Sequence, residues 1–124
     1  MGKKKILVTD DEENIRLLVS NMLGKHYIVI GASDGKEAVD MAHSQKPDLI
    51  LMDIMMPRMD GYTACSTIKK DPATKAIPIV MISAIGHELN VKLGQEIGAN
   101  GYITKPFQLQ DLQDAIDRFL KSPA

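Results

Sequence analysis

Short apolar runs alternate five times with longer amphipathic stretches along the chain. The run at residues 49–52 contains no polar position, which is typical of a strand buried on both faces of a parallel sheet. In the first amphipathic stretch, Ile15, Leu18, Val19 and Met22 recur at helical spacing. The runs predict strands over residues 6–9, 27–30, 49–52, 77–82 and 102–104, and the amphipathic stretches predict helices over residues 11–23, 33–47, 61–70, 87–97 and 107–120.

This alternation of strands and helices predicts an α/β fold. With short connections, it predicts parallel strands with helices on both faces of the sheet. Right-handed crossovers between parallel strands then leave few topologies. We expect a doubly wound, five-stranded parallel sheet in the order 2-1-3-4-5, with five helices. The chain has 124 residues, of which 44% are hydrophobic, so we expect a single domain over residues 1–124.

Polar side chains follow four of the five predicted strands. The carboxyl ends of parallel strands share one edge of the sheet, so residues that directly follow different strands lie near each other. Asp53 ends the central run, and Pro57 and Asp60-Gly61 then force the chain to turn. The other residues expected at this edge are Asp10 and Asp11 after the first strand, Ser83 and Ala84 after the fourth, and Lys105 after the fifth.

Three carboxylates in one pocket repel one another, and each raises the free energy of ionising the next. Hard oxygen ligands of this kind suit Mg²⁺, and Lys105 would supply a second positive charge. Each acid also has a plainer explanation, because Asp53 could cap the following turn, and Asp10 and Asp11 could cap the first helix. Four consecutive acids up to Glu13 exceed what capping requires. A loop with four acids and no glycine argues against a nucleotide phosphate site.

Composition argues against several classes of function. The chain has 15 Lys and Arg residues against 16 Asp and Glu residues, without the basic excess of a nucleic-acid-binding domain. No apolar run approaches the roughly 18 residues of a membrane span, and we expect no signal peptide. Cys65 is the single cysteine, and we expect it to be a buried, inert thiol. We therefore expect a cytoplasmic protein with no direct nucleic-acid partner and no membrane partner.

Five marks occur in order along the chain: the Asp10-Asp11 pair, Asp53 within Leu-Met-Asp-Ile-Met-Met-Pro, Asp60-Gly61, Ser83-Ala84 and Lys105-Pro106-Phe107. With these marks, residues 4–120 resemble the receiver domains of two-component response regulators. Each mark alone is weak, but five in order at the ends of the right strands are specific. The resemblance implies a flavodoxin-like fold and a single-domain receiver similar to the chemotaxis regulators.

The resemblance implies that Asp53 is a phosphoacceptor whose carboxylate attacks phosphorus to give an acyl phosphate. The donor would be a sensor histidine kinase or a histidine phosphotransfer protein. Lys105 would neutralise the equatorial oxygens during transfer. The Ser83 hydroxyl and the Ala84 backbone N–H would bind the phosphoryl group after transfer.

The resemblance also implies a metal cofactor, Mg²⁺. Its ligands would be Asp11, Asp53 and the backbone carbonyl of Met55, with Asp10 acting through a water molecule. The Lys105 peptide bond to the following proline would be cis.

The output implied by the resemblance is a conformational switch. Ser83 would move toward the phosphoryl group, and Tyr102 would rotate into the vacated space, although a plain surface aromatic on an edge strand is the alternative for Tyr102. The surface of the fourth helix, fifth strand and fifth helix would then select a downstream protein target, with the chain a monomer or a weak dimer on phosphorylation. The fourth helix is expected to be the least regular, since Gly94 interrupts it. The chain would not be a classical enzyme, although it would catalyse its own Mg²⁺-dependent phosphorylation and a slow autodephosphorylation.

Two other classes compete with this interpretation. A Mg²⁺-dependent phosphatase with an Asp nucleophile would share the acyl phosphate chemistry. Such enzymes usually carry a second acid two residues after the nucleophile, and here that residue is Met55. A phosphate-independent interaction module would not need Asp53, Asp11 and Lys105 together, yet all three are present.

Overall fold

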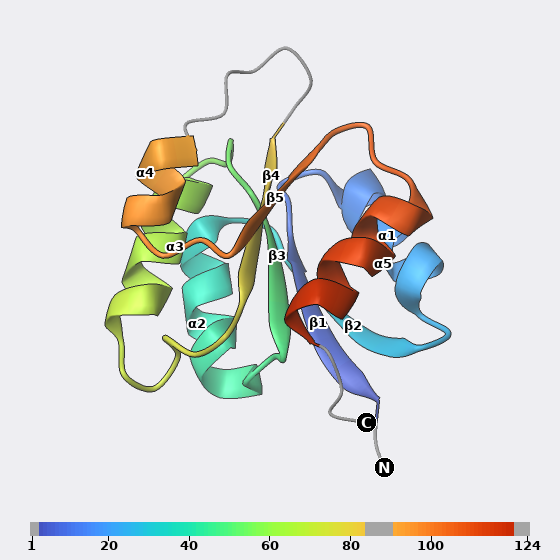
Figure 1. Cartoon of the computed structure of the whole chain (residues 1–124), viewed down its shortest axis with the longest axis horizontal. Helices are drawn as coiled ribbons and strands as arrows, with labels where there is room; N and C mark the ends of the chain where they lie inside the picture. Colours follow the sequence, from blue (N-terminus) through green and yellow to red (C-terminus); the bar gives the residue numbers. More distant parts are fainter. Residues whose placement is uncertain (1–2, 84–90, 121–124) are drawn as a thin grey trace.

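The computed structural model describes residues 3–83 and 91–120. Five parallel strands form one sheet in the order β2-β1-β3-β4-β5, and helices cover both of its faces (Figure 1). The predicted fold class and strand order are confirmed. The elements in chain order are β1 (Lys4–Thr9), α1 (Glu13–Leu23), β2 (Tyr27–Ala32), α2 (Gly35–Gln45), β3 (Leu49–Asp53), α3 (Gly61–Lys70), β4 (Ile79–Ser83), α4 (Val91–Glu96), β5 (Gly101–Thr104) and α5 (Leu109–Phe119).

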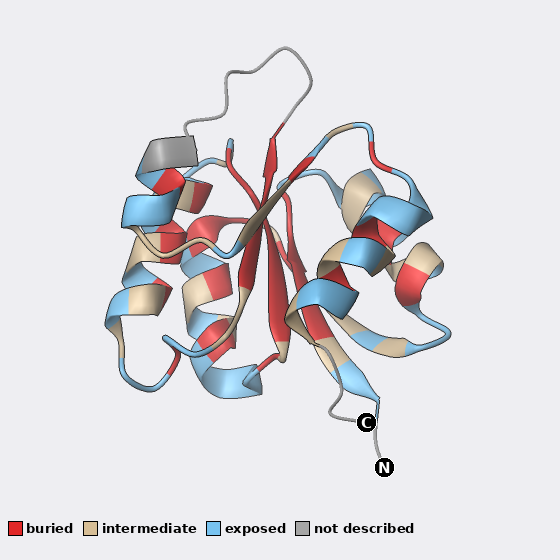
Figure 2. Cartoon of the chain, viewed as in Figure 1, coloured by how far each residue is buried: buried red, intermediate tan, exposed pale blue. Residues whose placement is uncertain are grey.

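Strand β3 is the centre of the sheet, with every residue buried between β1 and β4 (Figure 2). Its side chains alternate between two hydrophobic cores. Leu49 and Leu51 pack in the core that α1 and α5 cover, and Ile50 and Met52 pack in the core that α2 and α3 cover. Burial on both faces explains why this strand reads as an unbroken apolar run.

The sequence predicted the bounds of α3 correctly because both ends carry strong local signals. The Asp60 carboxylate accepts a hydrogen bond from the backbone N–H of Thr63 at 2.8 Å and caps the helix. Gly61 begins the helix where a Cβ atom would lie 2.2 Å from the backbone oxygen of Asp53, so only glycine fits. Its N–H donates to the carbonyl oxygen of Ile54 at 2.8 Å. The start of α3 is therefore fixed against the end of β3.

Helix α1 begins two residues later than predicted. The Asp10 carboxylate accepts a hydrogen bond from the backbone N–H of Glu12 at 2.9 Å, and Glu12 adopts an extended conformation before the helix begins at Glu13. The inward face also differs, because Leu18 is 41% exposed whereas Leu23 is buried in the core.

Helix α5 also begins two residues later than predicted. Gln108 and Asp111 form a capping box, so the first helical residue is Leu109. Phe107 precedes the helix and is buried in the core. Of the predicted helix over residues 87–97, the described part is α4, and residues 84–90 lie outside the described residues.

The expectation for the single cysteine is also met. Cys65 is a buried free thiol, and burial raises its pKa to about 11, although the charge of Lys69 opposes this shift. An unionised thiol is a poor nucleophile, which agrees with an inert packing role. Among the described helices, none has both the length and the apolar character needed to cross a membrane.

Candidate functional site

Three carboxylates meet at the carboxyl ends of β1 and β3. Asp53 is the last residue of β3, and Asp10 and Asp11 directly follow β1, which pairs with β3. One oxygen atom from each of the three carboxylates lies within 4.8 Å of the others. Asp10 and Asp53 are buried, whereas Asp11 is exposed. The pairing of β1 with β3 thus brings these acids together, as expected from the strand order.

Lys105 faces two of these acids. Its ammonium nitrogen donates a hydrogen bond to Asp10 Oδ2 at 2.8 Å and lies 3.6 Å from Asp53 Oδ2. The backbone N–H of Lys105 donates to the carbonyl oxygen of Ser83 at 2.7 Å, which ties the loop after β5 to the end of β4. The Lys105-Pro106 peptide bond is cis, as predicted.

The remaining predicted residues that the structure describes lie on β4, on β5 and in the loop after β3. Ser83 is the last residue of β4 and is buried, and the preceding residue pairs with Asp53 across the sheet. Met55 is 58% exposed, two residues beyond Asp53. Tyr102 lies partly buried in β5, three residues before Lys105. Ala84 lies outside the described residues, so its expected backbone role stays a prediction.

The ionisation of Asp53 reflects its surroundings. Burial, together with the negative charges of Asp10 and Asp11, raises its pKa to about 6, although the charge and hydrogen bond of Lys105 lower it. Burial lowers the pKa of Lys105, but the hydrogen bond to Asp10 and the charge of Asp53 outweigh burial, and the net shift is upward. Lys105 is therefore a permanent cation at the site, and it only partly compensates three acids.

The donor set suits a small divalent cation. Carboxylate oxygens are the ligands that Mg²⁺ prefers, and it typically takes one or two of them and keeps several water molecules. Asp10 and Asp53 supply oxygens from the buried side, and the exposed Asp11 supplies one from the solvent side. A divalent ion would also offset the negative charge that Lys105 leaves uncompensated. The residues present therefore fit Mg²⁺.

We expect Mg²⁺ to raise the free energy of unfolding, because a ligand that binds only the folded state stabilises it by about 3 kcal/mol at 100 times its Kd. Asp11→Asn should weaken this stabilisation, because Asp11 supplies one of the three oxygens. The measurement is the thermal midpoint at increasing MgCl₂. Asp48→Asn is the matched control, because Asp48 precedes the other end of β3 and accepts from the N–H of Lys5. Equal Mg²⁺ responses in Asp11→Asn and the wild type would show that the Asp11 carboxylate does not bind the ion.

The loop between β3 and α3 is anchored on the first turn of α2, a feature that the sequence analysis missed. Asp34 Oδ1 accepts from the N–H of Glu37 at 2.8 Å and caps α2, while its Oδ2 accepts from Arg58 Nε at 2.7 Å. The N–H of Gly35 donates to the carbonyl oxygen of Met59 at 3.1 Å. The sheet topology could have indicated this contact. Helix α2 begins after β2, at the same edge of the sheet where the loop after β3 begins.

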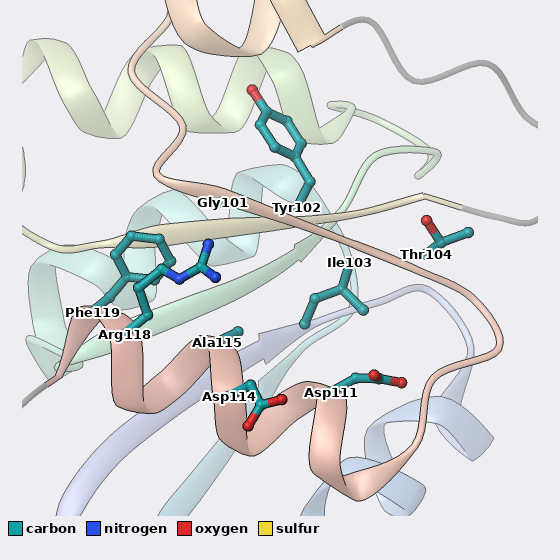
Figure 3. Close-up of a pocket in the computed structure, with 9 residues that line it drawn as sticks. All are labelled: Gly101, Tyr102, Ile103, Thr104, Asp111, Asp114, Ala115, Arg118 and Phe119. Atoms are coloured by element: carbon teal, nitrogen blue, oxygen red, sulfur yellow. The ribbon is translucent and has the colours of Figure 1, made fainter.

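A separate pocket of about 400 Å³ lies between β5 and α5 (Figure 3). Its lining includes Thr104 on the strand and Asp111, Asp114 and Arg118 on the helix, and none of the three acids near Lys105. It lies on the strand–helix surface that the sequence analysis expected to contact partners.

Comparison with known proteins agrees with this geometry. The family model described as the response regulator receiver domain matches residues 6–117. The alkaline phosphatase synthesis transcriptional regulatory protein PhoP of Bacillus subtilis is 42% identical over 119 residues, which are 95% of this chain and 49% of that protein. The chain spans about half the length of the curated relatives it matches, among them PhoP and the probable transcriptional regulator ycf27 of Guillardia theta.

Solved structures give the same result. A putative response regulator from Chloroflexus aurantiacus superposes with a TM-score of 0.90 at 33% identity, covering 98% of this chain and 100% of that chain. The receiver domain of a sensor histidine kinase from Pseudomonas aeruginosa, described with a magnesium ion coordinated in its active site cleft, gives a TM-score of 0.88 at 30% identity. It covers 98% of this chain and 100% of that chain. From the matched family model, the shared fold and the acids at the ends of β1 and β3, we conclude that this chain belongs to the response regulator receiver domains of two-component signalling.

Proposed function

We propose that Asp53 accepts a phosphoryl group from a phosphohistidine on a sensor histidine kinase or a histidine phosphotransfer protein. The observation that carries this proposal is a buried carboxylate at the end of the central strand, 3.6 Å from the Lys105 ammonium and beside two further acids. An Asp53 oxygen attacks phosphorus and forms a P–O bond, while the P–N bond to the imidazole breaks. The electron pair of that bond returns to the ring nitrogen, and the product on this chain is an acyl phosphate.

The residues around Asp53 have distinct roles in this reaction. Lys105 places a fixed positive charge beside the oxygens of the transferring group, where charge accumulates in the transition state. Ser83 and the backbone N–H of Ala84 bind the phosphoryl oxygens after transfer. Lys105 also holds Asp10 through the 2.8 Å hydrogen bond, which fixes one side of the acidic cluster.

We assign Asp11, Asp53 and the backbone carbonyl of Met55 as ligands of Mg²⁺, with Asp10 acting through a water molecule. When bound, the ion supplies positive charge next to phosphoryl oxygens that the carboxylates alone would repel. Two observations support this assignment. The three carboxylates lie close together, and their combined negative charge exceeds the single positive charge of Lys105.

The output is a change of the surface formed by α4, β5 and α5. Phosphorylation adds negative charge and acceptor oxygens within reach of the Ser83 hydroxyl. Ser83 moves toward them, Tyr102 follows, and the altered surface selects a downstream protein. The pocket between β5 and α5 supports this surface as a place for contact (Figure 3).

The domain itself acts through protein contacts. Curated relatives are named transcriptional regulators and are about twice as long as this chain, so nucleic-acid binding in those proteins need not involve the receiver portion. We assign residues 1–124 to one receiver domain that contacts no nucleic acid and no membrane, and that is a monomer or a weak dimer when phosphorylated. It is not a classical enzyme, because it phosphorylates itself and hydrolyses its own acyl phosphate slowly.

The decisive experiment is incubation with acetyl phosphate and Mg²⁺, followed by intact mass measurement. We expect the wild type to gain the mass of one phosphoryl group, lost again on treatment with hydroxylamine, and Asp53→Asn to gain none. Asp48→Asn is the matched control, because it removes a carboxylate next to the opposite end of β3 and should be phosphorylated normally. Equal incorporation in Asp53→Asn and the wild type would refute the assignment. Turnover of many equivalents of a small phosphate ester would favour a phosphatase instead.

A further inference from the structure

We propose that Gly94 of α4 is the seat of the Tyr102 ring, and that this seat holds the switch in its resting state. The steric part of this proposal rests on the structure alone. The regulatory part rests on the proposed function, because it assigns a consequence for phosphorylation of Asp53.

The contact between Gly94 and Tyr102 leaves no room for a Cβ atom at position 94 while the Tyr102 ring stays in place. A Cβ atom built on Gly94 would lie 2.1 Å from the Tyr102 hydroxyl oxygen and 2.9 Å from ring carbons Cε1 and Cζ. Gly94 is buried, and the first three contacts that its Cβ would meet all belong to Tyr102. The missing side chain of Gly94 is thus replaced in space by the phenol of Tyr102.

The Tyr102 ring lies on the α3–α4 side of the sheet. Figure 3 shows the ring pointing away from α5 and toward α4, whereas the neighbouring Ile103 points toward α5. Tyr102 packs against the core that includes α3, and Tyr62 and Cys65 of that helix are close enough to affect its ionisation. Burial raises the pKa of the Tyr102 hydroxyl, and the two neighbours raise it further. The ring therefore fills a space bounded by α3 and by the surface of α4 where Gly94 has no side chain.

This arrangement gives Gly94 a reason to be glycine. Glycine inside a helix is unfavourable relative to alanine, because it loses more backbone freedom on folding. In α4 the missing side chain of Gly94 leaves space for the phenol of Tyr102, and packing of the phenol in that space offsets the cost. The sequence alone presents the glycine only as a weakness of the helix.

The seat is directly connected to the proposed site through the sheet. Tyr102 lies in β5, and the pairing of β4 with β5 aligns Ile82 with Ile103 and Ser83 with Thr104. Lys105 follows immediately and donates its backbone N–H to the carbonyl oxygen of Ser83. Tyr102 itself pairs with Met81, so departure of the ring from Gly94 and movement of Ser83 involve positions two residues apart on two paired strands. A ring held at Gly94 opposes its rotation toward Ser83.

The phenol is the far end of a flexible side chain, so a methyl group at position 94 should displace the ring without unfolding the domain. We expect Gly94→Ala to move the ring resonances of Tyr102 in NMR spectra of the unphosphorylated protein and to lower its pKa toward the ordinary tyrosine value. Tyr27, in β2 at the other edge of the sheet, serves as the internal reference. Unchanged Tyr102 resonances and an unchanged pKa would overturn the steric seat.

A double-mutant cycle separates the seat from helix propensity. In a Tyr102→Ala background, Gly94→Ala should raise the folding equilibrium constant about fivefold, which is the usual gain of alanine over glycine in a helix. In the wild-type background the gain should be absent or reversed, because the methyl group must expel the ring. Gln95→Ala is the matched control on the exposed side of α4 and should behave alike in both backgrounds. Equal effects of Gly94→Ala in both backgrounds would also overturn the seat.

The regulatory part is tested by phosphorylation with limiting acetyl phosphate. Gly94→Ala should increase the phosphorylated fraction about fivefold, a common size for coupling between two sites, and Tyr102→Ala should remove this increase. A displaced ring with an unchanged or lower phosphorylated fraction would overturn the regulatory part and leave the seat standing. Failure of the wild type to be phosphorylated at all would refute the proposed function, while the NMR result would still decide the seat.

Discussion

Asp53→Asn is expected to raise the free energy of unfolding at neutral pH without divalent cations by about 3 kcal/mol, since a pKa raised from 3.8 to about 6 corresponds to that energy. The charged carboxylate is held in a buried place beside Asp10 and Asp11, which favours its protonated form. The asparagine amide has a similar shape and no charge, so the variant does not carry the free-energy cost of a buried charge beside two acids. Urea unfolding of both proteins in the presence of EDTA measures the difference.

The pH dependence of this difference has a definite sign. Above pH 6, Asp53 is ionised in the folded and the unfolded protein, and its buried charge destabilises the folded wild type by the full amount. As the pH falls from about 6 toward 3.8, the folded protein takes up the proton first, so the wild type gains stability relative to Asp53→Asn. Below 3.8 the group is protonated in both states and the two proteins should be equally stable. Asp48→Asn should show no such gain at neutral pH. A wild type more stable than Asp53→Asn at pH 7 in EDTA would contradict the prediction.

Lys105→Met is expected to have the opposite effect on stability and to impair the chemistry. Removing the ammonium leaves the buried Asp10 without its 2.8 Å partner and next to Asp53, and breaking a buried pair in this way typically costs about 3 kcal/mol. Loss of one positively charged donor should also slow phosphorylation by acetyl phosphate by about 100-fold. Urea unfolding in EDTA and the initial rate of mass gain measure the two effects.

The control for this variant is Lys69→Met. Lys69 is also partly buried, but it donates to the carbonyl oxygens of Lys75 and Ile77, outside the acidic cluster. It should lose some stability and keep the normal phosphorylation rate. A phosphorylation rate of Lys105→Met equal to that of Lys69→Met would remove Lys105 from the proposed mechanism.

The parts of the fold that could be predicted are those with local or topological causes. The central strand β3 is recognisable because it is buried on both faces, and α3 is bounded by Asp60-Gly61 and Asp71-Pro72, where turn residues act locally. The convergence of Asp10, Asp11 and Asp53 follows from a rule about parallel sheets and needs no knowledge of side-chain positions.

The parts that could not be predicted depend on side-chain geometry between distant residues. Nothing local indicates that Lys105 would approach Asp10 more closely than Asp53, because both acids are near the same edge. The exposure of Leu18 depends on how α1 is rotated against the sheet. The room between Gly94 and Tyr102 appears only when α4 and β5 are packed together.

The shared carboxylate of Asp34 has a consequence for how motion near Asp53 can be observed. This single group caps α2 through Glu37 and also holds Arg58 in the loop that follows β3. Whenever that loop lifts away from α2, the helix loses part of what fixes its first turn. Hydrogen–deuterium exchange at the Glu37 amide is therefore a local gauge of loop opening, readable at a residue that takes no part in the phosphoryl chemistry.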